Sequence, residues 1–282
     1  MGRGGGKNAR RDRARRQTIV NELSIIIVSF NARRDLVACL KSLTDAPPAV
    51  AHQIVVVDNA SSDGSGDAAR GFPSVRTLVL DRNVGFAAAN NTGIRASDGE
   101  LVLLLNSDTV VPAGALDRLI ERLRAVPAAR VAGPRLVDGD GRPEVSFGRM
   151  ISPFNELRQK VLGQTGLFAR LTSREQLVDW VSGACLLVYR ADAEAVGLLD
   201  ERFFLYTEDV DFCASIRARG GAVLFTPAAE VVHLRGRSRA AAPAATQAAY
   251  RRSQLAFYEK HHPGWAPVLR WYLRAKGEKP KA

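Results

Sequence analysis

The sequence predicts an α/β fold in which helices flank a mostly parallel sheet. Over the first 125 of the 282 residues, short apolar stretches rich in β-branched residues alternate with stretches that have apolar residues at helical spacing. That alternation is typical of strands joined by helical crossovers. Three apolar stretches also run into polar groups that contain acids, namely Asp58, Asn106-Ser107-Asp108 and Glu208-Asp209-Val210-Asp211. Ligands of open α/β sheets bind at the carboxyl ends of strands, so these positions indicate an enzyme that handles a nucleotide diphosphate.

In the first half we expect four strands with a helix after each one. The continuous apolar run 24–28 is typical of a strand buried on both faces, and further strands are expected at 54–57, 75–80 and 101–105. Helices are expected at 33–43, in a short segment after the turn-rich loop 59–66, at 86–97, and at 113–125 behind Pro112.

The second half is less regular. We expect a hairpin around 138–141, a strand at 181–190, a helix at 191–197, and short strands at 223–226 and 230–234. Thr207 suits the N-cap of a helix over 208–219, and an Ala-rich helix covers 242–260. This pattern divides the chain into a disordered basic arm (1–20), a catalytic domain (21–240) and a C-terminal helical extension (241–282).

Composition excludes some classes of protein. Residues 1–16 hold seven basic residues and one acidic residue, which is +6 of the net charge of +11 and leaves +5 for the rest. Such an arm suits contact with nucleic acid or an anionic membrane, or serves as a solubilising tail. No apolar run reaches the length of a membrane span and no signal peptide opens the chain, so we expect a cytoplasmic protein.

Cys39, Cys185 and Cys213 are read as buried free thiols.

Six short motifs follow one another in a diagnostic order. They are Val28-Ser29-Phe30-Asn31, 57–64 (VDNASSDG), Asn83-Val84-Gly85-Phe86, Asn106-Ser107-Asp108, Ser182-Gly183-Ala184 and Glu208-Asp209-Val210-Asp211. Together they resemble the family 2 glycosyltransferases with the GT-A fold, and most of all the rhamnosyltransferase-type bacterial members. The resemblance covers roughly residues 22–260. It implies an inverting, metal-dependent transfer of a sugar from a nucleotide-diphosphate donor to an acceptor hydroxyl.

The resemblance assigns the donor site to residues that follow the first strands. Ser29, Phe30 and Asn31 would line the pocket for the base and ribose, and Asp58 would accept a hydrogen bond from a pyrimidine ring nitrogen. Phe30 is equally suited to a core, and Asp58 to starting an Asx-turn.

Two further stretches complete the expected donor site. Asn83 and Gly85 precede a helix, where glycine lets the backbone approach a ligand and free amides suit a polar or anionic group. An ordinary loop-to-helix turn explains them equally well. Asn106 and Ser107 are also expected to contact the donor.

Asp108 aligns with the last carboxylate of the family's Asp-x-Asp motif, the usual metal ligand. Asn106 replaces the first Asp, which lowers the local negative charge. His233 stands where family members often carry a metal-binding histidine, although a buried structural histidine is the alternative. The implied ion is Mg²⁺ or Mn²⁺, which neutralises the charge that builds on the diphosphate leaving group. Arg235 and Arg237 would add to that neutralisation.

Asp209, together with Glu208, matches the family's Glu-Asp motif and is the expected catalytic base. Acids in the first turn of a helix also stabilise its dipole, which is the alternative reading. Trp180 offers a flat face to an acceptor sugar, beside Ser182 and Gly183, but it suits core packing as well.

The C-terminal stretch 265–276 mixes Trp, Tyr and Leu with Arg and Lys, which suits a helix at an anionic membrane surface. Packing back onto the domain is the alternative. Because family members often use polyprenyl-linked acceptors, we expect peripheral contact with the inner face of the cell membrane.

Rhamnose from a thymidine-diphosphate donor is the favoured reaction, in the synthesis of a cell-surface polysaccharide. Transfer of galactofuranose or another hexose from a uridine-diphosphate donor is the alternative. A nucleotidyltransferase would need a lysine-bearing, Gly-rich loop after the first strand, and Ser29-Phe30-Asn31 lacks one. A basic nucleic-acid-binding protein is the reading from another class, but no nucleic-acid motif appears, so no specific nucleic acid is expected as a partner.

Overall fold

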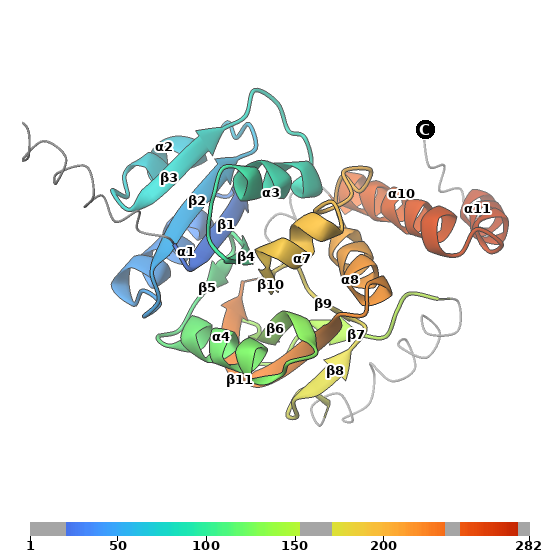
Figure 1. The fold of residues 1–282 in the computed structure, drawn as a ribbon. Helices are drawn as coiled ribbons and strands as arrows, with labels where there is room; N and C mark the ends of the chain where they lie inside the picture. Colours follow the sequence, from blue (N-terminus) through green and yellow to red (C-terminus); the bar gives the residue numbers. More distant parts are fainter. Residues whose placement is uncertain (1–20, 153–170, 235–242, 276–282) are drawn as a thin grey trace, which may run out of the picture.

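The computed structural model describes residues 21–152, 171–234 and 243–275. The expected basic arm at 1–20 therefore lies outside the described residues, as do Arg235 and Arg237. The expectation of an α/β fold is confirmed: helices cover both faces of one large sheet (Figure 1).

The first half of the sheet is parallel throughout, in the order β3-β2-β1-β4. Its strands are β1 (Leu23–Ser29), β2 (His52–Asp58), β3 (Val75–Val79) and β4 (Leu101–Asn106). All seven residues of β1 are buried, as its continuous apolar run predicts for a strand covered on both faces. On one face lie α1 (Arg33–Asp45) and α2 (Ser65–Arg70), and on the other lies α3 (Phe86–Arg95).

The second half of the sheet is mixed. Its strands are β5 (Thr109–Val110), β6 (Ala129–Val137), β8 (Gln176–Val178), β10 (Cys185–Tyr189) and β11 (Ala222–His233). β10 is antiparallel to both β4 and β6, whereas β6 and β11 are parallel to each other. The short strands β7 (Phe147–Gly148) and β9 (Trp180–Val181) form a separate pair.

Helices α4 (Ala115–Ala125), α7 (Arg190–Ala195) and α8 (Glu208–Ala218) cover this half. The strands expected at 223–226 and 230–234 are one strand, β11, whose register shifts between Thr226 and Glu230. Thr207 does stand at the N-cap of α8, but its side chain makes no capping bond: its hydroxyl donates to the Tyr206 carbonyl at 2.6 Å. All three cysteines are buried and free, as expected.

Of the C-terminal helices, α10 (Pro243–His261) lies beside α8, and α11 (Ala266–Ala275) lies at the outer end of α10 (Figure 1). Phe257 and Tyr258 of α10 are buried in a cluster with Phe203 and Val210, which flank the start of α8. Through these side chains α10 is packed against the start of α8.

Candidate functional site

Three predicted donor residues meet at one edge of the sheet. Ser29 is in register with Asp58 at the ends of β1 and β2, and Val28 is in register with Asn106 at the end of β4. Because these strands are parallel, their carboxyl ends bring Ser29, Asp58 and Asn106 side by side, where α/β sheets bind ligands.

Two buried oxygens at this edge lack partners. Asp58 Oδ1 and Ser29 Oγ have no hydrogen bond within the part of the chain that the structure describes, although both residues are buried. Buried polar atoms are nearly always satisfied, so orphaned acceptors at a strand end indicate a missing ligand. A Cβ added to Gly66 would lie 2.8 Å from Asp58 Oδ2, so Gly66 leaves space for this carboxylate.

Phe30 and Asn31 form the loop after β1. The Phe30 side chain is 45% exposed, which removes the alternative that it belongs to the core. Asn31 has φ of 51°, and its side-chain oxygen accepts a bond from the Ser62 N–H at 2.8 Å. Asn31 thereby ties the loops after β1 and β2 together, beside the orphaned oxygens.

Asn83 and Gly85 are held by Asn59, a buried residue that the sequence did not single out. Asn59 Nδ2 donates to Asn83 Oδ1 at 2.9 Å, and Asn59 Oδ1 accepts from the Val84 N–H at 2.9 Å. At Gly85 the structure shows a close protein neighbour on the side where a Cβ would stand. The backbone of Phe204 fills that space, since an added Cβ would lie 2.6 Å from its carbonyl oxygen. That carbonyl also accepts the Phe86 N–H at 2.7 Å, so the first amide of α3 is not free.

The two predicted metal ligands are in contact. Ser107 and Asp108 form the turn between β4 and β5, and His233 ends β11 opposite Thr109. Asp108 Oδ1 lies 3.2 Å from His233 Nε2, and Asn106 Nδ2 lies 3.5 Å from the same nitrogen. On the far side of the ring, His233 Nδ1 lies 3.0 Å from Glu144 Oε2. Burial alone would lower the pKa of His233, but the hydrogen bonds and charges of Asp108 and Glu144 outweigh it and raise that pKa.

Asp108 and His233 fit a divalent ion that also binds a diphosphate. Among the described residues, no group of three or more His, Cys, Asp or Glu could hold a metal by itself. Two protein ligands suffice when phosphate oxygens and water complete the shell. Carboxylate and imidazole are both ordinary ligands of divalent metals.

The predicted base begins α8. Asp209 Oδ2 accepts the Gly183 N–H and Oδ1 accepts the Val210 N–H, each at 2.8 Å. Burial raises the pKa of Asp209 in spite of these bonds. Burial and then the charge of Asp209 raise the pKa of Glu208 well above its usual value, and Glu208 Oε2 has no partner in the described structure.

The backbone before the base is strained. Tyr206 and Thr207 are consecutive non-glycine residues with φ of 70° and 64°. Such conformations are costly and persist where surrounding structure enforces them, often at functional sites.

Of the predicted acceptor residues, Ser182 and Gly183 lie in the turn that contacts the predicted base, whereas Trp180 packs against the core. The Gly183 N–H contacts Asp209, and the carbonyl of the next residue, Ala184, accepts the Asn106 N–H at 3.0 Å. This turn therefore connects the predicted base to the strand end next to the predicted metal ligands. Ser182 lies in the same turn, where its hydroxyl accepts the Ala184 N–H at 3.3 Å. Trp180 is half-buried against two core clusters and its indole N–H donates to the Arg149 carbonyl at 3.0 Å, which favours the packing alternative.

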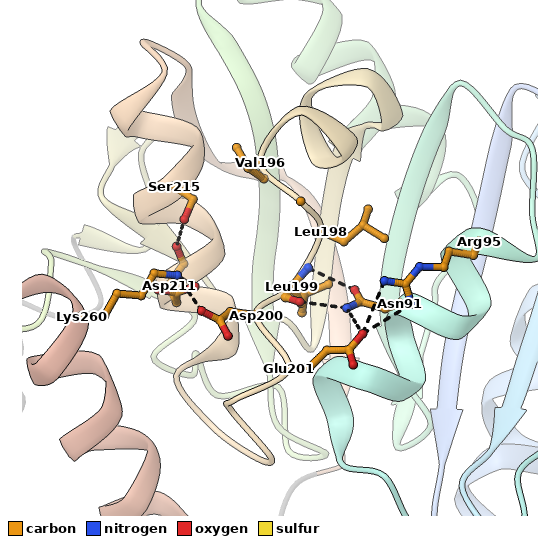
Figure 2. Close-up of a pocket in the computed structure, with 11 residues that line it drawn as sticks. Asn91, Arg95, Val196, Leu198, Leu199, Asp200, Glu201, Asp211, Ser215 and Lys260 are labelled. Atoms are coloured by element: carbon orange, nitrogen blue, oxygen red, sulfur yellow. Dashed lines mark hydrogen bonds and ion pairs between the residues drawn. The ribbon is translucent and has the colours of Figure 1, made fainter.

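Asp211 faces away from this site, toward the C-terminal helices. It is buried, and it accepts bonds from Lys260 at 2.9 Å and His261 at 2.6 Å, while Lys260 also reaches Asp200 at 2.9 Å. Figure 2 shows Asp200, Asp211 and Lys260 along a cavity of about 350 Å³ between α3, α8 and α10. None of the predicted site residues line it, and Asp211 lies two positions from Asp209, about 200° around the helix. The cavity is therefore behind the candidate active site.

Sequence reasoning missed Asn59, Glu144 and Lys260. Asn59 lies within the motif at residues 57–64, so the sequence already drew attention to this segment. Glu144 and Lys260 lie in unremarkable stretches, and only the folded contacts reveal them.

Comparison with known proteins agrees with this geometry. The family model described as glycosyl transferase family 2 matches residues 24–179. A Mycobacterium tuberculosis protein, named N-acetylglucosaminyl-diphospho-decaprenol L-rhamnosyltransferase, is 34% identical over 279 residues and covers 89% of each chain.

Two solved structures share the fold. A mannosyltransferase of Pyrobaculum calidifontis, in complex with GDP-Man and Mn²⁺, superposes with a TM-score of 0.61 at 18% identity, over 89% of this chain and 68% of that one. GalNAc-T7 with UDP, GalNAc and Mn²⁺ gives 0.59 at 17% identity, over 77% of this chain and 44% of that one. These likenesses confirm the GT-A fold.

Proposed function

This chain belongs to the family 2 glycosyltransferases, and we propose that it transfers rhamnose from a thymidine-diphosphate donor, with inversion, to a polyprenyl-linked glycan in cell-surface polysaccharide synthesis. The observation that supports the transfer best is the contiguous edge at which Asp58, Asn106, Asp108, His233 and Asp209 gather. The named activity of the mycobacterial relative supports the sugar and the acceptor class.

The donor nucleotide binds at the first half of the sheet. Asp58 Oδ1 and Ser29 Oγ are buried acceptors that a pyrimidine ring N–H or a ribose hydroxyl would satisfy. Phe30, exposed beside them, offers an apolar face to the base. Asn31 and Asn59 position the surrounding loops.

Asp108 and His233 would hold a divalent ion, Mn²⁺ or Mg²⁺, against the diphosphate. Bound there, the ion would neutralise the negative charge of the leaving group. Asn106 contacts His233 and supplies a neutral amide where a second carboxylate would add negative charge next to the ion.

Asp209 accepts the proton. The acceptor oxygen forms a bond to the anomeric carbon as the bond from that carbon to the diphosphate oxygen breaks, and the hydroxyl proton passes to the Asp209 carboxylate. Its raised pKa makes Asp209 a stronger base than an ordinary aspartate. The raised pKa of Glu208 favours the neutral acid, which avoids a second negative charge beside the base.

An assay with dTDP-rhamnose and a polyprenyl-diphosphate N-acetylglucosamine acceptor tests this proposal. We expect rhamnosylated lipid with Mn²⁺ or Mg²⁺ and none with EDTA. A parallel reaction with UDP-galactofuranose tests the alternative donor, and transfer from that donor alone would overturn the assignment of rhamnose.

We further propose that α11 rests on the membrane that carries the acceptor. Leu273 is buried, while Trp265, Val268, Trp271 and Tyr272 are 44%, 52%, 71% and 40% exposed. Arg274 lies in the last turn of the helix, and exposed aromatics beside arginine suit an anionic bilayer surface. In the described ranges, no helix is long and apolar enough to cross a membrane.

Sedimentation with vesicles tests this contact. We expect wild type to pellet with phosphatidylglycerol vesicles, and a Trp265→Ser, Trp271→Ser double variant to stay in the supernatant. Leu177→Ser, which alters an equally exposed side chain on β8, serves as the control. Equal pelleting of the double variant and wild type would refute this role of α11.

A further inference from the structure

Glu144 occupies a defined place beside the proposed metal ligands. It follows the turn after β6, and its N–H donates to the Leu136 carbonyl at 2.9 Å, which folds the chain back toward the end of β11. Its side chain is 10% exposed, so its carboxylate is largely removed from water.

The imidazole of His233 is held between two carboxylates. Glu144 Oε2 lies 3.0 Å from Nδ1 and Asp108 Oδ1 lies 3.2 Å from Nε2. The histidine side chain is itself 8% exposed. The two ring nitrogens therefore face different partners, with Asp108 on the side of the donor edge and Glu144 behind it.

A histidine that ligates a metal through one nitrogen usually donates its other N–H to a carboxylate, which fixes the tautomer and the ring orientation. We infer that Glu144 is such a positioning residue: it accepts the Nδ1–H of His233 and keeps Nε2 directed at the ion held with Asp108. This inference rests on the proposed metal role of Asp108 and His233.

The inference gives Glu144 a role that its neighbours do not share. Glu230 lies on the same strand as His233, but it is half-exposed and faces Arg135, with 3.5 Å between Glu230 Oε2 and Arg135 Nε. Loss of the Glu230 charge should leave the metal site unchanged, so Glu230→Gln is a matched control for Glu144→Gln.

The test measures binding of Mn²⁺ by electron paramagnetic resonance, with purified full-length protein and saturating thymidine diphosphate. We expect Glu144→Ala to raise the Mn²⁺ dissociation constant about 10- to 100-fold, as outer-shell losses do elsewhere. Glu144→Gln, which keeps an acceptor oxygen, should raise it less, and Glu230→Gln should not change it. Nucleotide binding in EDTA should be the same in all variants, which separates a positioning role from general disruption.

The reference variants Asp108→Ala and His233→Ala separate the possible failures. If both weaken Mn²⁺ binding but neither Glu144 variant does, the positioning role is wrong and the proposed metal site stands. If Asp108→Ala and His233→Ala bind Mn²⁺ as wild type does, the metal site fails and the role of Glu144 fails with it. Should Glu144→Ala not fold, the comparison of Glu144→Gln with Glu230→Gln decides the matter.

Discussion

The two halves of the sheet build their parts of the site in different ways. In the parallel half, three of the predicted donor residues lie at the ends of strands, so Ser29, Asp58 and Asn106 come together through strand register. In the mixed half, the turn at Gly183 contacts Asp209, and the pairing of β11 with β5 brings His233 beside Asp108. Lys260 of α10 contacts Asp211, in the same helix as the proposed base. The proposed nucleotide site thus depends on the register of neighbouring parallel strands, whereas the proposed catalytic and metal-binding groups depend on contacts between distant segments.

The largest expected effect tests the catalytic half. Asp209→Asn keeps the shape of the side chain and removes the base, so we expect kcat to fall by about 10²- to 10⁴-fold. Nucleotide affinity, which the parallel half supplies, should stay the same. Turnover assays and a nucleotide titration measure the two quantities, and loss of both would show that Asp209 has a structural role.

The matching change in the parallel half is Asp58→Ala. It removes the orphaned acceptor, and a hydrogen bond to a charged group contributes about 1.5–3 kcal/mol, so donor nucleotide affinity should fall roughly 10- to 150-fold. Isothermal titration with thymidine diphosphate in EDTA measures the loss. Unchanged affinity would mean that Asp58 only starts a turn.

The difference between the two halves of the sheet also explains which features could be predicted from the sequence. The parallel strands, α1 and α3 followed from apolar periodicity, and the donor residues followed from their place after strands. Glu144 and Lys260 could not be foreseen, because their importance comes from partners 89 and 49 residues away in the chain. The neighbour of Gly85, Phe204, is likewise distant in the chain and could not be foreseen.

The contact between Lys260 of α10 and Asp211 of α8 is tested by Lys260→Met. This change removes a cation from Asp211, whose side chain is 2% exposed, and leaves the contact with His261 in place. We expect a loss of about 1–3 kcal/mol in the free energy of unfolding, because a buried carboxylate loses a bond. Lys41→Met, on the exposed face of α1, should change stability by less than about 0.5 kcal/mol. Chemical denaturation measures the free energy of unfolding of both variants. Equal values would show that the contact between Lys260 and Asp211 does not stabilise the protein.

The smallest expected effect concerns pH. Because the pKa of Glu208 is raised in the folded protein, folding favours its protonated form, and stability declines as pH rises above the unfolded value near 4.5. Glu208→Gln removes that decline, so its melting temperature relative to wild type should increase from pH 4 to pH 8. A constant difference across this range would contradict the raised pKa.

The central claim is that the parallel half binds the nucleotide while Asp108 and His233 bind the metal on its diphosphate. A thermal-shift panel of nucleoside diphosphates, with and without Mn²⁺, on wild type and Asp108→Ala tests it most directly. We predict that one pyrimidine diphosphate raises the wild-type Tm, that Mn²⁺ increases this shift, and that Asp108→Ala loses the increase while keeping the metal-free shift. No shift with any nucleotide, or a Mn²⁺-dependent increase that survives in Asp108→Ala, would contradict the account.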